Sequence, residues 1–363
     1  MDRAAAIKVP LLDLRAQYAS VKDEVDEAVA HVLERGNYVM GREVEAFEAE
    51  WAQYCSAKYC IGVSSGTDAI HLAIRGFQKM TEQPKPSVTA PCATFIATVE
   101  PAIRAGCALK LADVDVHGLL RSPAGPGRGQ IVLPVALYGR PVGWVEGEYY
   151  HGYAVIEDLA QAHGHPLRGL AAAFSFYPSK NLGAVGQAGA VVTNNTSLME
   201  EVRRLRSHGE GRLRFVHVDL SGNYRMDELQ AAILRAKLPH LDAWNRHRRK
   251  VASEYCRLLA DVPGITLPEL VPAHVHHIFC IRTPRRDDLA AFLAERGVQT
   301  AVRYPLALHQ QPALSFLKSK AGDFPNAEAW AWENLSLPIY ETMPQEQVEY
   351  VASAVREWAK RQP

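Results

Sequence analysis

The feature that most constrains the fold is an alternation of short apolar runs with helical or loop segments in the first half of the chain. The apolar runs have the length and composition of buried strands, and they cover residues 88–91, 108–112, 131–135 and 154–156. Strands that alternate with helices form a mostly parallel sheet whose two faces are covered. The sequence therefore predicts an α/β fold with a mostly parallel central sheet flanked by helices. Ligands of such sheets bind at the carboxyl ends of the strands.

The rest of the chain of 363 residues fits a large domain followed by a smaller one. Apolar residues at helical spacing predict helices at 18–34, 43–54, 226–238 and 241–259, with a break near Pro239. The Pro- and Gly-containing stretch 263–272 predicts the boundary, so the large domain covers residues 1–262 and a smaller C-terminal α+β domain covers residues 263–363. In the smaller domain we expect strands at 277–282 and 298–302 and helices at 287–296 and 345–360.

The composition argues against several classes of function. Lysine plus arginine equals aspartate plus glutamate at 40 each, so no net charge attracts nucleic acid or an anionic membrane. No apolar run is long enough to span a bilayer and the N-terminus lacks a secretory pattern, which predicts a cytoplasmic protein. The six cysteines lack CxxC spacing, which favours reduced thiols over a metal site or disulfides.

One lysine stands in an unusual setting. Lys180 lies between two runs that are predicted to be buried strands, 171–177 and 188–193. A lysine in this position must be desolvated or covalently occupied, and either condition favours the neutral amine that forms Schiff bases with carbonyls. The alternative is a loop lysine with its ammonium group in water, which is the usual state of lysine.

Three other stretches place functional side chains at predicted strand or helix ends. Gly66 and Thr67 open a helix whose N-terminus can bind a phosphate, although such openings also occur as ordinary caps. Asp158 and Gln161 follow a buried strand, where a carboxylate needs a cationic partner. Phe95 follows another strand and can either stack on a ligand or belong to the core.

Together with Lys180, these stretches predict pyridoxal 5'-phosphate as the cofactor. That cofactor needs a phosphate cradle, an aromatic side chain against its ring, a carboxylate at its pyridine nitrogen and a lysine for its aldehyde. Each requirement has a candidate in the sequence, and no metal is predicted.

Motifs along nearly the whole chain resemble the DegT/DnrJ/EryC1/StrS family of sugar aminotransferases, which have the type I (aspartate aminotransferase) fold. In chain order these motifs are VPLLDLRAQY, SSGTDAI, TFIAT, LYG, EDLAQAHG, FSFYPSKNLGAVG, AGAVVTN, GNYRMDELQAAIL and RYPLALHQQPA. The resemblance implies that the large domain binds pyridoxal phosphate.

The resemblance also implies a role for each candidate residue. Lys180 forms the Schiff base and carries the proton, Asp158 pairs with the pyridine nitrogen, and Gln161 bonds the ring oxygen. The remaining cofactor contacts are the phosphate ligands and the stacking ring, which are Gly66, Thr67, Ser175 and Phe95. Asn223 comes from the neighbouring subunit to the same phosphate, which implies a homodimer with shared active sites.

The implied reaction moves an amino group from L-glutamate to a keto group of a nucleotide-linked deoxysugar, with pyridoxamine 5'-phosphate as the intermediate form of the cofactor. The RYPLALHQQPA stretch favours C3 of the sugar. A C4 sugar aminotransferase, a keto-cyclitol aminotransferase and a non-catalytic regulator of the same fold are the alternatives. His163, His309 and Tyr304 are candidate sugar contacts, and the two histidines can equally be structural.

Two stretches depart from the family pattern. The chain is shorter than usual between TFIAT and LYG and between EDLAQAHG and FSFYPSK, and Gln187 stands where aspartate or glycine is common. We interpret these departures as trimmed surface loops, which affect the fit of the substrate more than the chemistry.

Overall fold

A computed structural model describes residues 8–123 and 127–361. Its centre is an eight-stranded sheet with the order β1-β8-β7-β6-β4-β2-β3, and β5 pairs with β6 beside this path. The strands are β1 (Tyr59–Val63), β2 (Ser87–Pro91), β3 (Ala108–Ala112), β4 (Ile131–Val132), β5 (Tyr149–Tyr150), β6 (Tyr153–Asp158), β7 (Ala171–Ser175) and β8 (Gly189–Thr193). Strand β8 is antiparallel to β1 and β7, and β5 is antiparallel to β6, whereas the other neighbours are parallel. The prediction of a mostly parallel sheet is confirmed.

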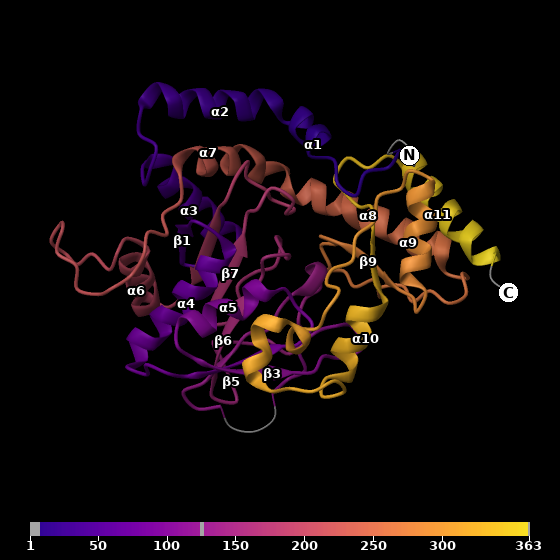
Figure 1. Ribbon diagram of the computed structural model, residues 1–363. Helices are drawn as coiled ribbons and strands as arrows, with labels where there is room; N and C mark the ends of the chain where they lie inside the picture. Colours follow the sequence, from indigo (N-terminus) through magenta and orange to yellow (C-terminus); the bar gives the residue numbers. More distant parts are fainter. Residues whose placement is uncertain (1–7, 124–126, 362–363) are drawn as a thin grey trace.

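Strands β6, β7 and β8 are buried on both faces of the sheet, and successive side chains of a strand point to opposite faces. Ala171 and Ala173 of β7 face a core formed with α4 (Gly66–Thr81), α5 (Glu100–Arg104) and α6 (Thr196–Arg206). Ala172 and Phe174 face a second core formed with α3 (Arg42–Tyr54) and α7 (Glu228–Lys237). The sheet is therefore flanked by helices on both sides, as predicted and as Figure 1 shows.

The N-terminal helices form an outer layer over α7. The helix predicted at 18–34 is in fact two helices, α1 (Leu14–Ser20) and α2 (Lys22–Arg35), separated at Val21, which has non-helical backbone angles. Val21 and Val25 pack against Ile233 and Trp244, and α2 lies along the outer side of α7 (Figure 1). The predicted stop is correct, because Gly36 ends α2 in the left-handed conformation.

The C-terminal part of the chain builds a further core. It contains α8 (Leu241–Leu259), α9 (Arg286–Glu295), α11 (Gln345–Lys360) and a two-stranded antiparallel sheet of β9 (Phe279–Arg282) and β10 (Asn334–Leu337). Helix α10 (Pro325–Glu333) instead packs on the large core through Ala327 and Trp330. The boundary at residue 263 stays a prediction, because residues on its C-terminal side contribute to both cores.

One predicted strand is wrong. Residues 298–302 form only single bridges, from Val298 to Val9 and from Ala301 to Ser336. The segment has a different partner at each end, so no continuous ladder forms. The strand that pairs with β9 is β10, which the sequence pattern did not reveal.

Several properties of the described part of the chain bear on the function classes considered above. None of its helices is long and apolar enough to cross a membrane. It contains no group of three or more histidine, cysteine, aspartate or glutamate side chains placed to hold a metal ion. All six cysteines are free, and only Cys256 among them is not fully buried.

Candidate active site

A cavity of about 440 Å³ opens where the carboxyl ends of β1, β2, β6 and β7 meet. This volume is in the range of small-molecule sites. Most of the predicted site residues line it, namely Gly66, Thr67, Phe95, Asp158, Gln161, Ser175, Lys180 and Tyr304. Segments far apart in the sequence therefore converge here because parallel strands present their carboxyl ends on the same edge.

One side of the cavity is the start of α4. Ser65 is its N-cap, and the Ser65 Oγ accepts a hydrogen bond from the backbone N–H of Asp68 at 3.1 Å. The first N–H groups of the helix, on Gly66 and Thr67, have no partner within the helix and lie at its positive end. A Cβ atom at Gly66 would lie 2.5 Å from the Cβ of Ser175, so only glycine lets the helix start approach the end of β7 this closely. The result is a cradle suited to a phosphate.

Asp158 forms the floor of the cavity at the end of β6. Its side chain is buried, and it accepts hydrogen bonds from Thr98 Oγ1 at 2.7 Å and from the N–H of Ala160 at 3.1 Å. Burial raises the pKa of this carboxyl, while the hydrogen bonds and the nearby Lys180 act in the opposite direction. No arginine or lysine of the described residues forms an ion pair with Asp158. The carboxylate is therefore available to a cationic group of a ligand.

Lys180 faces Asp158 from the turn that follows β7. Its backbone N–H donates to the carbonyl of Tyr177 at 2.8 Å, which fixes the turn. Burial lowers the pKa of Lys180 to about 8, with a further lowering by Arg303 and an opposing effect of Asp158. The side chain is thus desolvated, as the first of the two sequence interpretations expects, and its amine is far more often neutral than that of a lysine in water.

Gln161, Tyr304 and Phe95 form a connected wall. The Gln161 side chain accepts from the N–H of Tyr138 at 2.7 Å and donates from Nε2 to the Tyr304 hydroxyl at 3.3 Å. The ring of Tyr304 stacks on that of Phe95, with 5.0 Å between ring centroids and 26° between planes. Phe95 is 48% exposed, so its ring belongs to the cavity wall and not to the core.

These features fit pyridoxal phosphate. The cavity offers free N–H groups at a helix start, an unpaired buried carboxylate, exposed aromatic surface and a desolvated lysine amine. They match the cofactor's phosphate, ring nitrogen, ring face and aldehyde in turn.

His163 does not line this cavity. It is completely buried and packs against Trp51, Phe174 and Phe176, with ring centroids 5.4 to 5.8 Å apart. Burial lowers the pKa of its imidazole to about 3. The structure therefore favours the structural interpretation of this histidine over the sugar contact.

His309 also lies outside the cavity lining. Its Nδ1 is 3.1 Å from Cys92 Sγ and its Nε2 is 3.0 Å from a carboxylate oxygen of Glu328. Both ring nitrogens are therefore occupied by protein groups, and the side chain is buried. His309 ties the end of β2 to α10, which favours the structural interpretation of this histidine over the sugar contact.

Asn223 is exposed and lies outside the cavity of its own chain. Its side-chain oxygen accepts a hydrogen bond from Arg225 Nε at 2.8 Å. The contact across a subunit interface stays a prediction.

Other residues of the site were missed by the sequence reasoning. Thr98, which donates to Asp158, lies within the motif TFIAT, and Arg303 directly precedes Tyr304 in RYPLALHQQPA. Their position within these two motifs was the only feature of the sequence that could have identified them as site residues. Gln187, noted as a departure from the family pattern, also lines the cavity.

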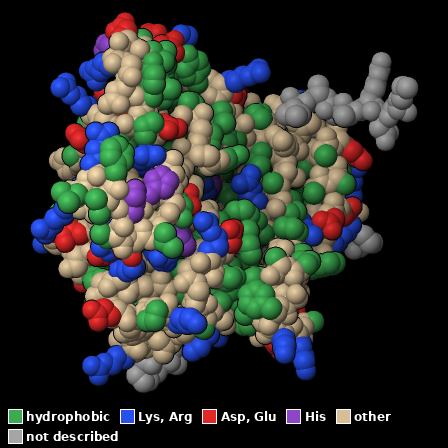
Figure 2. Space-filling view, turned by 60° about the vertical axis from the view of Figure 1, so that its left-hand side comes forward, with side chains coloured by type: hydrophobic (Ala, Val, Ile, Leu, Met, Phe, Trp, Pro, Cys, Tyr) green, Lys and Arg blue, Asp and Glu red, His purple; other side chains and the backbone are tan. Residues whose placement is uncertain are grey.

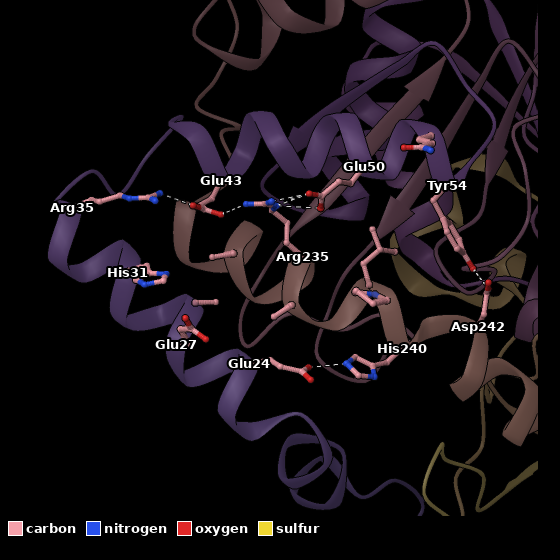
Figure 3. A pocket seen from close by; sticks show the side chains of 16 residues that line it. Glu24, Glu27, His31, Arg35, Glu43, Glu50, Tyr54, Arg235, His240 and Asp242 are labelled. Carbon is pink, nitrogen blue, oxygen red and sulfur yellow. Dashed lines mark hydrogen bonds and ion pairs between the residues drawn. The ribbon is translucent and has the colours of Figure 1, made fainter.

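A larger hollow of about 1110 Å³ lies elsewhere, between α2, α3 and α7 (Figure 3). It contains none of the predicted site residues. Its charged and polar side chains bond one another, in the groups Arg35–Glu43–Arg235–Glu50, Glu24–His240 and Tyr54–Asp242. Because these groups are largely satisfied within the protein, the candidate chemistry belongs to the smaller cavity.

The chain belongs to the DegT/DnrJ/EryC1/StrS aminotransferase family, whose model matches residues 19–356. It is 42% identical over 379 residues to the dTDP-3-amino-3,4,6-trideoxy-alpha-D-glucose transaminase of Streptomyces venezuelae, covering 99% of this chain and 98% of that protein. The expected family is confirmed, and the protein is an aminotransferase.

Solved structures agree with this assignment. The chain is similar to S. venezuelae DesV in complex with a ketimine intermediate, with a TM-score of 0.90, 39% identity and coverage of 99% of this chain and 100% of that one. It is also similar to NtdA from Bacillus subtilis with bound cofactor PMP, with a TM-score of 0.85, 28% identity and coverage of 94% and 82%. Dependence on pyridoxal phosphate follows from the family.

Proposed function

We propose that this protein transfers an amino group from L-glutamate to the C3 keto group of a nucleotide-linked deoxysugar. The observation that carries the proposal is that Lys180, with its lowered pKa, and the buried Asp158 share one cavity. The substrate class is supported by the S. venezuelae relative, which is a dTDP-3-amino-3,4,6-trideoxy-alpha-D-glucose transaminase.

The cavity residues would hold pyridoxal phosphate as follows. The N–H groups of Gly66 and Thr67 and the hydroxyl of Ser175 would bind the phosphate, and Asp158 would bond the ring nitrogen. The remaining contacts would be a hydrogen bond from Gln161 to the ring oxygen and stacking by Phe95. When bound, the cofactor supplies an aldehyde for amines and a ring that withdraws electrons from the reacting carbon.

Lys180 would carry the proton in both halves of the reaction. Its Nζ must be neutral to remove the proton from the α-carbon of the amino donor. With a pKa of about 8, roughly a tenth of the amine is neutral at pH 7. In the first half, the Lys180 ammonium would pass this proton to the aldehyde-derived carbon of the cofactor. In the second half, the neutral amine would take a proton from that carbon and give it to the sugar carbon that receives the amino group.

We also propose a homodimer in which Asn223 reaches the phosphate of the other subunit. The segment between α6 and α7 projects from the body of the molecule (Figure 1) and exposes Leu213, Phe215 and Leu220, the last at 92%. Figure 2 views the molecule from nearer this side and shows hydrophobic side chains gathered around a hollow. Exposed apolar side chains of this kind mark interaction surfaces, and a second copy would cover them.

The proposal is tested by incubating the holoenzyme with L-glutamate and a panel of acceptors, followed by mass analysis. The panel holds dTDP-, UDP- and GDP-linked 3-keto and 4-keto sugars and a keto-cyclitol. We expect 2-oxoglutarate and an aminated 3-keto sugar. Amination of 4-keto sugars alone, or of a keto-cyclitol alone, would replace the proposed acceptor with that one. Protein that shows no cofactor absorbance, even after added pyridoxal phosphate, would instead be a regulator.

A further inference from the structure

Arg303 lines the active-site cavity from a segment without regular secondary structure. Its backbone is held firmly, because its N–H donates to Asn334 Oδ1 at 2.7 Å and its carbonyl accepts from the Tyr138 hydroxyl. The backbone is thus fixed while the guanidinium borders the cavity that contains Lys180. The charge is close enough to lower the pKa of Lys180.

Arg303, which is partly exposed, differs from two buried arginines of this protein. Arg206 pairs with Glu48, and Arg248 pairs with Glu341 at 2.7 Å. Within residues 8–123 and 127–361, no carboxylate forms an ion pair with Arg303. A guanidinium that borders a cavity and has no carboxylate partner there can bind an anionic ligand that enters the cavity.

The position of Arg303 selects among the anions that enter this site. In the proposed function, the cofactor phosphate is already held at the start of α4. The diphosphate of a nucleotide sugar is attached to C1, two carbons away from the reacting C3. The α-carboxylate of the amino donor is bonded to the carbon whose proton Lys180 removes, so the cation that holds it must lie beside Lys180.

We propose that Arg303 binds the α-carboxylate of the amino donor and thereby selects α-amino acids as donors. The planar guanidinium can donate two parallel hydrogen bonds to a carboxylate, which fixes the donor's α-carbon as well as its charge. This inference rests on the proposed function and adds the residue that recognises the first substrate.

A small space with buried polar atoms lies beside Arg303. This space of about 30 Å³ is lined by Arg303, Ser179, His277 and Ser336. The His277 Nε2 and Ser336 Oγ atoms are buried without a hydrogen-bond partner. A site with two such atoms and this volume suits one water, which can bond the guanidinium when no carboxylate is present.

The test compares Arg303→Gln and Arg303→Lys with Arg356→Gln as a matched control. Arg356 forms an exposed ion pair with Asp261 and does not line the cavity. The first measurement is calorimetric binding of glutarate, a dicarboxylate without an amino group, to each holoenzyme. We expect binding to weaken about 10- to 100-fold in R303Q, as for loss of a charge-assisted hydrogen bond, and less in R303K. R356Q should bind as the wild type does.

The second measurement separates the two anionic substrates. In R303Q the KM for L-glutamate should rise about tenfold or more, while the KM for the nucleotide sugar changes little. A larger rise in the KM of the sugar, or unchanged glutarate affinity in R303Q, would overturn the inference and leave the proposed function intact. A wild-type holoenzyme that takes no amino group from glutamate would contradict the proposed function itself. Equal melting temperatures and cofactor absorbance of the variants establish that the substitution acts locally.

Discussion

Lys180 and Lys237 are both withdrawn from bulk water, and burial lowers the pKa of each. Lys180 lines the cavity at the strand ends, close to Asp158. Lys237 is 4% exposed on α7, where its Nζ donates to the carbonyl of Gly183 at 2.9 Å and to Gln17 Oε1 at 3.1 Å. Desolvation alone therefore does not make a lysine reactive, because its amine must also line a cavity that a substrate can enter.

The two lysines are connected through the loop that carries Lys180. Gly183 lies three residues beyond Lys180, so the hydrogen bond from Lys237 holds this loop from the side opposite the cavity. The same hydrogen-bonded group links the loop to α1 through Gln17. We therefore expect Lys180 to control chemistry and Lys237 to control the stability of the loop.

The strongest test removes each amine in turn. Lys180→Ala should abolish transamination, a loss of at least about 10³-fold, because both the covalent partner and the proton carrier disappear. Lys237→Met should retain most of the activity. The measurement is 2-oxoglutarate formation from L-glutamate with a reactive keto acceptor, and appreciable turnover by the Lys180 variant would contradict its assignment.

The next effect concerns Asp158, the carboxylate that lines the same cavity as Lys180. Asp158→Ala should lower the rate by about 10²- to 10³-fold, since the ring nitrogen would lose its charged partner. Asp158→Asn preserves the size of the side chain and removes only its charge. It should therefore also lower the rate, which separates the loss of charge from the loss of volume. If both variants worked at near wild-type rates, Asp158 would have no role in the chemistry.

The pH dependence distinguishes the two amines directly. Burial disfavours the ammonium form of Lys180 and places its pKa at about 8 instead of 10.5. The rate at which the apoenzyme captures pyridoxal phosphate should therefore rise about tenfold per pH unit below pH 8 and level off above it. Stopped-flow absorbance measures this profile, which should be the same in Lys237→Met. A midpoint near 10.5 would mean that Lys180 is hydrated.

The loss of stability, in contrast to the loss of activity, should be larger for the Lys237 variant than for the Lys180 variant. Lys237→Met leaves the Gly183 carbonyl and the Gln17 side chain without their donor, which should cost about 1–3 kcal/mol of unfolding free energy. The change is measured by urea denaturation, with Lys318→Met as control, because Lys318 is exposed and its side chain forms no hydrogen bond or ion pair with the described residues. An unchanged midpoint of urea unfolding in Lys237→Met would contradict the proposed role of Lys237 in the stability of the loop.

The smallest expected effect lies across the subunit interface. Asn223→Ala should remove one hydrogen bond to the phosphate, which corresponds to about 1 kcal/mol or roughly a fivefold faster loss of cofactor. Dialysis followed by absorbance measures retention. Retention at the wild-type level would mean that Asn223 makes no contact with the cofactor phosphate across the subunit interface.

Much of the fold could be predicted from local patterns. The strand at 108–112 and the helices at 241–259 and 345–360 have the predicted bounds in β3, α8 and α11, because their apolar periodicity is continuous. Strand β1 and strand β10 were missed, and residues 298–302 formed no strand. In these segments the decisive factor is a partner strand far away in the chain, which no local pattern contains.

The sequence by itself determined which chemical groups stand at the ends of the strands: the lysine, the carboxylate and the helix start that can bind phosphate. A mostly parallel sheet then brings its strand ends together, so their convergence follows from the alternating pattern. The tertiary structure alone decided which side chains are occupied elsewhere. His309 bonds Cys92, a residue 217 positions away, whereas the Arg303 guanidinium forms no ion pair with any described residue. Such differences arise only where distant segments pack together.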